Sequence, residues 1–156
     1  MQEIRANRLS VLAVIPGEVD QQSVRTILTR SKWKLRLVST VEEAEGILDE
    51  GDTDVVLADS DSLAGSWRRM LQVTGGSASP SVIVASRLGE DALWAEVLNL
   101  GGFDVVLKPF DSEELLHTVS MAGRHHRALN VRTAVLQQEI AMSSPEFSGG
   151  MPRAES

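Results

Sequence analysis

Two charged residues stand where two apolar runs of the chain end. Asp59 closes the run Asp54–Ala58, and Lys108 closes the run Phe103–Leu107. Short apolar runs without alternation are typical of strands buried on both faces of a parallel sheet. The carboxyl ends of such strands meet at one edge, where open α/β sheets bind their ligands. A carboxylate and an ammonium at that edge indicate a site for an anion, or for a side chain that becomes one.

Five such runs alternate with five stretches of helical character. The runs cover residues 9–15, 35–38, 55–58, 81–85 and 103–107, and the helical stretches cover about 21–30, 40–49, 64–73, 90–100 and the segment that begins at Asp111 or Ser112. Ser39 and Thr40 are each followed three residues later by a glutamate, Glu42 and Glu43, a capping-box pattern at the start of the second helix. Strict alternation with short loops predicts an α/β fold: a doubly wound, five-stranded parallel sheet between helices.

Side-chain spacing predicts how two of these helices face the sheet. Trp67, Met70 and Leu71 should point inward from the third helix. In the fourth helix Leu93, Val97, Leu98 and Leu100 are expected to anchor the packing, while Trp94 stays partly exposed. Gly101 and Gly102 should end that helix, because glycine readily adopts the left-handed conformation past a helix end.

The last helix leaves two interpretations open. Leu115, Ala122, Leu129 and Leu136 recur every seven residues, with Val119 and Ile140 four after the first and last, but His126 and Thr133 weaken the seam. Either the helix projects and pairs with a second copy or a partner, or it ends near Gly123 and a loosely helical tail follows. We expect a flexible start over 1–8, a folded unit over 9–123, a helical extension over 124–142 and a disordered tail over 143–156.

Composition narrows the classes of function. The chain has 156 residues with 15 basic and 22 acidic side chains, a formal charge of −7, which argues against a nucleic-acid-binding surface. It contains no cysteine, so thiol catalysis and cysteine-based zinc sites are excluded. The longest apolar runs are far too short to span a membrane, and residues 1–8 lack the apolar core of a signal peptide. We expect a cytoplasmic location.

The layout resembles a response-regulator receiver domain of two-component signalling, a (βα)5, flavodoxin-like fold. The resemblance covers about residues 8–127 and rests on Asp54-x4-Asp59, Ser86 after the fourth strand, and the run from Gly101 through Asp104 to Lys108-Pro109-Phe110. It implies that Asp59 accepts a phosphoryl group from a histidine kinase, that Ser86 hydrogen-bonds the phosphoryl oxygens, and that Lys108 pairs with them. A fixed ammonium and a hydroxyl donor suit the charge and acceptor oxygens of a phosphoryl group.

The chain departs from the family pattern where the family holds Mg²⁺. An acidic pair follows the first strand in the family, whereas Pro16 and Gly17 stand there in this chain; Glu18 and Asp20 are nearby, but nothing requires their side chains to reach the pocket. The resemblance leaves Asp59 and a backbone carbonyl near Asp61 as metal ligands, so we expect Mg²⁺ binding to be weak or absent.

Two further departures concern the switch. Val105 replaces an aromatic residue that often moves on activation, and it should simply pack; Leu63 replaces the proline usually found four residues after the phosphoacceptor.

Three functions remain open. The chain is an atypical receiver phosphorylated on Asp59, or a pseudo-receiver that binds partner proteins without phosphorylation, or an unrelated flavodoxin-like enzyme for a small anion, against which the absence of phosphate-binding glycines counts. The expected partner is a histidine kinase or another signalling protein. A homodimer could form through the fourth and fifth helices, or through the extension of the last helix. We expect the basic run Arg124-His125-His126-Arg127 to be a solvated helix face that complements the helix dipole.

Overall fold

A single five-stranded parallel sheet forms the centre of the molecule. The computed structural model describes residues 8–61, 66–74 and 79–150, with the backbone alone at 66 and 143–150. The strands are β1 (Ser10–Val14), β2 (Lys34–Val38), β3 (Val55–Asp59), β4 (Ser81–Ser86) and β5 (Asp104–Leu107), in the order β2-β1-β3-β4-β5. Every neighbouring pair is parallel, so all five carboxyl ends lie at one edge, as predicted.

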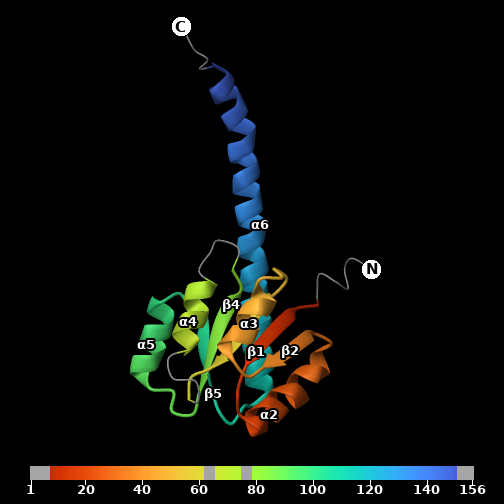
Figure 1. Cartoon of the computed structure of the whole chain (residues 1–156), viewed down its shortest axis with the longest axis vertical. Coiled ribbons are helices and arrows are strands. Elements are labelled where there is room, and N and C mark those ends of the chain that lie inside the picture. The colour runs from red at the N-terminus through yellow and green to blue at the C-terminus, as the bar shows by residue number, and fades with distance from the viewer. Residues whose placement is uncertain (1–7, 62–65, 75–78, 151–156) are drawn as a thin grey trace.

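Helices cover both faces of this sheet, as Figure 1 shows. They are α2 (Glu18–Leu28), α3 (Val41–Leu48), α4 (Ser66–Val73), α5 (Asp91–Asn99) and α6 (Ser112–Gly150), and a short 3-10 turn, η1 (Thr29–Ser31), follows α2. The buried residues of α2 and α6 belong to one apolar cluster, and those of α3, α4 and α5 belong to the other. The fold is therefore the doubly wound α/β class that the sequence predicted.

Alternating side chains of each central strand divide between the two clusters. In β3, Val55 and Leu57 join the cluster under α2 and α6, while Val56 and Ala58 join the cluster under α3, α4 and α5. All four residues are buried. A strand that buries both faces has no polar alternation, and this explains the apolar run before Asp59.

Most helices begin and end close to the residues predicted from the sequence, because neighbouring residues determine these ends. The Thr40 hydroxyl accepts a hydrogen bond from the Glu43 N–H, and the Glu43 carboxylate accepts one from the Thr40 N–H, which completes the predicted capping box. Gly101 has a φ of 95°, the left-handed conformation expected after α5. The first helix begins at Glu18, three residues before the predicted Gln21.

Two predictions about α5 and the basic run of α6 were wrong. Leu98 and Leu100 are each 50% exposed, so only Val97 is fully buried in α5, while Trp94 is partly exposed as expected. A short amphipathic helix buries one stripe, and Leu98 lies beside that stripe. His126 is buried instead of solvated because Asp54, at the start of β3, receives it.

The last helix continues without a break past Gly123, which excludes the shorter of the two interpretations. A Cβ at Gly123 would lie 2.5 Å from Leu9 Cδ1, so the glycine serves a close approach between α6 and the residue before β1. The backbone stays helical to Gly150, where the sequence predicted a disordered tail from Ser143. That expectation rested on the lack of apolar periodicity from Ser143 onward.

Other expectations concern segments outside the described residues. These include the flexible start over 1–7, Leu63, and the end of the tail over 151–156. Trp67, Met70 and Leu71 are buried as predicted, and so is Val105. None of the helices in the described ranges combines the length and the apolar character that a membrane span requires.

Candidate functional site

Asp59 and Lys108 meet at the carboxyl edge of the sheet. Asp59 is the last residue of β3, and Lys108 directly follows β5, two strands away in the sheet. The Lys108 ammonium donates a short hydrogen bond to Asp59 Oδ1, and both side chains are 1% exposed. The peptide bond from Lys108 to Pro109 is cis. The sequence thus predicted correctly that these two opposite charges converge.

Two more carboxylates surround the same ammonium. Lys108 Nζ lies 3.0 Å from Asp20 Oδ2 and 2.9 Å from Asp61 Oδ2. Asp20 comes from the first turn of α2, and Asp61 follows β3 by two residues. A lysine ammonium has three N–H bonds, and here each has a carboxylate partner. We call Asp20, Asp59, Asp61 and Lys108 the carboxyl-edge cluster.

These carboxylates control the protonation of Lys108. Burial alone would lower the pKa of the ammonium, but its hydrogen bonds to Asp59, Asp61 and Asp20 outweigh burial and raise the pKa to about 12. The side chain therefore remains a cation throughout the neutral pH range. A permanent cation at this edge is what an incoming anion would meet.

Ser86 lies at the same edge, at the end of β4. It is buried, and its backbone carbonyl accepts a hydrogen bond of 2.9 Å from the Lys108 N–H. Its hydroxyl oxygen accepts hydrogen bonds from the backbone N–H groups of Leu88 (3.2 Å) and Gly89 (3.3 Å). The hydroxyl hydrogen is left to donate elsewhere, because these two bonds use only the acceptor side of the oxygen.

Arg87 reaches the edge of the cluster from outside. Its backbone N–H donates to Asp61 Oδ2 at 3.0 Å, and its guanidinium Nη2 lies 3.7 Å from Asp20 Oδ1. The Arg87 side chain is 57% exposed, so solvent screens this second contact. Three carboxylates therefore face one buried cation and one exposed cation, and the cluster carries an excess of negative charge.

The arrangement does not fit a divalent cation as it stands. Mg²⁺ takes oxygen ligands in near-octahedral geometry, yet the three carboxylates of the cluster all face the Lys108 ammonium. Across residues 8–61, 66–74 and 79–150, no three His, Asp or Glu side chains are grouped so that they could hold a metal ion. Asp61 contributes its carboxylate to the cluster, whereas the sequence had suggested only a backbone carbonyl near it.

A second ionic cluster lies at the opposite edge of the sheet. Asp54 directly precedes β3, and its carboxylate contacts His126 Nδ1 at 3.0 Å, Arg127 Nη2 at 3.2 Å and the Ser10 N–H at 2.9 Å. Arg127 also donates to the Arg8 carbonyl at 2.8 Å, and Asn130 Nδ2 lies 3.2 Å from His126 Nε2. We call Asp54, His126 and Arg127 the amino-edge cluster. It ties α6 to the first residues of β1 and β3.

The Asp54 carboxylate is held as an anion there. Burial would raise its pKa, but hydrogen bonds from His126, Arg127 and the Ser10 N–H outweigh burial, so the pKa lies below its usual value. The sequence analysis used Asp54 as the start of an apolar run and as part of the Asp54-x4-Asp59 motif, and assigned it no ionic partner. Its pairing with residues more than 70 positions away left no local signal.

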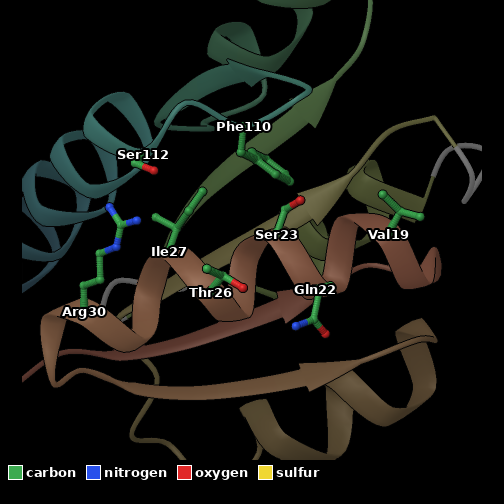
Figure 2. Close-up of a pocket in the computed structure, with 8 residues that line it drawn as sticks. All are labelled: Val19, Gln22, Ser23, Thr26, Ile27, Arg30, Phe110 and Ser112. Carbon is green, nitrogen blue, oxygen red and sulfur yellow. The ribbon is translucent and has the colours of Figure 1, made fainter.

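A groove lies between α2 and the start of α6. It has a volume of about 430 Å³. Figure 2 shows Ser23 and Ile27 of α2, and Arg30 of η1, projecting toward the segment that carries Phe110 and Ser112. Val19, at one end of the groove, adjoins Asp20, and Phe110 follows Lys108 by two residues. The groove is therefore continuous along the chain with two members of the cluster.

Comparison with known proteins identifies the fold. Neither a family model nor a curated protein matches the chain. Among solved structures, the signal receiver domain of an HD domain-containing protein from Pseudomonas fluorescens Pf-5 matches with a TM-score of 0.72 and 21% identity, over 81% of this chain and 94% of that one. The beryllofluoride-activated NtrC4 receiver domain dimer matches with a TM-score of 0.68 and 24% identity, over 75% and 98%.

A third match is a co-crystal structure from Saccharomyces cerevisiae. It contains the histidine phosphotransfer protein Ypd1 and the receiver domain of the response regulator Ssk1, and the match has a TM-score of 0.63 and 19% identity, over 75% of this chain and 90% of that one. All three structures have a receiver domain in common.

This chain has the receiver-domain fold. The resemblance inferred from the Asp59, Ser86 and Lys108 positions is thereby confirmed at the level of architecture. Within the receiver fold, Asp59 and Lys108 converge as predicted, and Ser86 lies at the same edge. The reach of Asp20 into the pocket was missed, because it depends on α2 beginning at Glu18. A helix that starts there carries Asp20 in its first turn.

Proposed function

We propose that this chain is an atypical receiver in a phosphorelay, with the Asp59 carboxylate as its phosphoryl acceptor. The observation that carries the proposal is the convergence of a buried carboxylate and a buried, permanently charged lysine at the carboxyl edge of a receiver fold. The solved structures that share this fold include receiver domains of signalling proteins. We accordingly propose a signalling module that at most takes up and later loses a phosphoryl group.

The transfer exchanges one bond for another. The P–N bond to an imidazole of the donor protein breaks, a P–O bond to an Asp59 oxygen forms, and the imidazole nitrogen keeps the electron pair and takes up a proton. Lys108 then neutralises part of the charge of about −1.5 to −2 on the new phosphoryl group. Because all three Lys108 N–H bonds are engaged, either Asp20 or Asp61 must release the ammonium to a phosphoryl oxygen. Ser86 would supply a hydroxyl donor from β4.

The donor would be a histidine kinase or a histidine phosphotransfer protein. A receiver of this fold was crystallised with such a phosphotransfer protein, which supports this class of partner. We propose that the donor docks at the groove between α2 and Phe110, since its lining residues Val19 and Phe110 lie one and two positions along the chain from Asp20 and Lys108. The apolar side chains of Ile27 and Phe110 would give it contact area, and Arg30 an ionic contact.

The surface that signals onward would be formed by α5 and β5. Exposed apolar side chains gather in this part of the chain: Trp94, Leu98 and Leu107 are 37%, 50% and 45% exposed. Exposed apolar groups close together mark interaction sites more often than isolated ones do. We propose that a homodimer forms through this face and the start of α6. The NtrC4 receiver domain, which has the same fold, is a dimer in its solved structure. We propose residues 9–123 as the receiver unit, with 124–142 as its helical extension, and we expect the whole to act in the cytoplasm.

One observation favours a second function. The buried ammonium already has three carboxylate partners, so the cluster is internally paired without phosphate or metal. A pseudo-receiver, which binds its partner whether or not Asp59 is phosphorylated, would need no more than this. The replacement of an acidic pair by Pro16 and Gly17 also favours a pseudo-receiver. We expect such a protein to bind Mg²⁺ weakly or not at all.

Exposure of the full chain to acetyl phosphate, with and without Mg²⁺, separates the two functions. Intact-mass spectrometry should detect one added phosphoryl group in the unmodified chain and none in Asp59→Asn. Asp61→Asn is the matched control, because it removes the same charge from the same cluster. A chain that gains no mass at millimolar Mg²⁺, with either acetyl phosphate or a phosphorylated histidine phosphotransfer protein, would exclude the phosphorelay function and leave the pseudo-receiver.

A further inference from the structure

The part of α6 that projects from the domain continues a stripe that is buried inside it. Leu115, Val119, Ala122 and His126 recur at alternating intervals of four and three residues, and all four are buried. The same intervals then give Leu129, Thr133, Leu136 and Ile140, which we call the distal stripe. Figure 1 shows α6 extending beyond the sheet, and no other helix or strand of the described residues lies beside this part.

The distal stripe exposes apolar surface on a helix that needs support. Leu129, Leu136 and Ile140 are 39%, 56% and 62% exposed. Residues 128–142, the part of the projecting helix whose side chains are described, form about 22 Å of helix at 1.5 Å per residue. Helices in proteins gain most of their stability from packing an apolar face. A partner helix on the distal stripe would supply that packing.

The charges beside the stripe indicate which partner fits. Arg132 and Glu139 both directly precede a residue of the distal stripe, so they lie on the same flank, seven residues apart. In a parallel pair of helices, this flank faces the opposite flank of the partner, where Arg132 would meet the uncharged Gln137. In an antiparallel pair, the flank faces itself. Arg132 then meets Glu139 of the second copy, and the contact occurs twice about the two-fold axis.

The apolar layers agree with the same arrangement. An antiparallel pair places Leu129 against Ile140 of the second copy and Thr133 against Leu136. A parallel pair would instead stack Thr133 on Thr133 in the middle of the seam. Polar residues at such positions commonly set register at a cost in stability, and here only the antiparallel arrangement gives each threonine an apolar neighbour.

We propose that two copies of this chain associate through the distal stripes of α6, as an antiparallel pair of helices. The occupant is a second copy because the flanking charges are complementary to themselves. The seam is short, so the dimer exchanges with monomer. Its formation does not depend on phosphorylation of Asp59.

Sedimentation equilibrium of the full chain tests the association, and charge reversal tests its geometry. The chain should self-associate reversibly; Arg132→Glu alone, or Glu139→Arg alone, should weaken the dimer roughly tenfold by creating two like-charge contacts. The double reversal, Arg132→Glu with Glu139→Arg, should restore it. Neither residue has a charged neighbour three or four positions away on the helix, so these changes leave intrahelical ion pairs unaltered.

Stripe variants supply the matched control. Leu136→Asp should abolish association, while Val131→Asp, on another face of the helix and 63% exposed, should leave it unchanged. Circular dichroism of each variant checks that the domain is folded. A chain that stays monomeric at every concentration, or equal weakening by Leu136→Asp and Val131→Asp, would overturn the proposal.

The absence of cysteine allows a direct test of direction. Thr133→Cys mixed with Leu136→Cys should cross-link to a mixed disulfide faster than either variant cross-links to itself. Faster self-cross-linking of both variants would show a parallel pair and overturn the antiparallel assignment.

Discussion

The two edges of the sheet hold ionic clusters of opposite composition. At the carboxyl edge, one buried cation, Lys108, meets three carboxylates. At the amino edge, one buried carboxylate, Asp54, meets two basic side chains and a backbone N–H. In the first cluster three carboxylates share one buried cation, so loss of any single carboxylate should cost little stability. The second depends on its only anion. We infer that the carboxyl-edge cluster can lose or modify one carboxylate and stay paired, whereas the amino-edge cluster cannot.

Removal of the central anion should therefore have the largest effect on stability. Asp54→Asn leaves Arg127 without its carboxylate and should lower the free energy of unfolding by about 2–3 kcal/mol. Asp59→Asn removes one of three anions around Lys108 and should change it by less than about 1 kcal/mol. Urea unfolding of both variants at neutral pH checks the comparison. Equal losses would show that the two clusters do not differ in this respect.

Removal of the central cation should cause the second largest loss in the free energy of unfolding. In Lys108→Met, three neighbouring carboxylates lose their common partner and repel one another, so we expect a loss of roughly 1–3 kcal/mol at neutral pH. Protonation relieves this repulsion, and the difference from the unmodified chain should shrink as the pH falls below the ordinary carboxyl range. Unfolding measured at several acidic pH values tests this trend. A difference that stays constant with pH would contradict the carboxylate repulsion.

The contribution of the amino-edge cluster to stability should also be lost in acid, through its single carboxylate. The folded pKa of Asp54 is depressed, so its contribution to stability is fully present above the usual Asp value and is lost as the pH falls through the folded pKa. The unmodified chain should therefore lose stability below about pH 4. Asp54→Asn should lose less over the same window. Thermal unfolding between acidic and neutral pH compares the two slopes.

Removal of the exposed cation, Arg87, should have the smallest effect on the free energy of unfolding. Arg87→Gln keeps the backbone N–H that binds Asp61 and removes only a screened contact of 3.7 Å to Asp20. We expect a change in unfolding free energy within about 0.5 kcal/mol. A larger loss, measured by the same urea titration, would show that Arg87 is a full member of the carboxyl-edge cluster.

The sequence predicted well what depends on local periodicity and on the parallel sheet. Asp59 and Lys108 each end an apolar strand, and the geometry of parallel strands alone brings their ends to one edge. The Thr40 capping box and the turn at Gly101 were equally accessible, because a few neighbouring residues determine them.

The parts that the sequence did not reveal depend on long-range or off-strand placement. Asp20 is four positions beyond Pro16, and only the exact start of α2 turns its carboxylate toward Lys108. Asp54 and His126 are separated by 72 positions, so no window of the sequence joins them. The basic run ending in Arg127 looked like a solvated helix end, because such runs usually are.

One helix joins the two edges. α6 begins four residues after Lys108, crosses the sheet, and passes His126 before it leaves the domain. From Ser112 to His126 it spans about 21 Å, and a continuous α-helix of that length resists stretching and twisting. A displacement of the segment that carries Lys108 should therefore move the whole of α6 as a rigid body. Either the contacts of Asp54 with His126 and Arg127 then change, or the helix beyond Arg127 moves relative to the sheet.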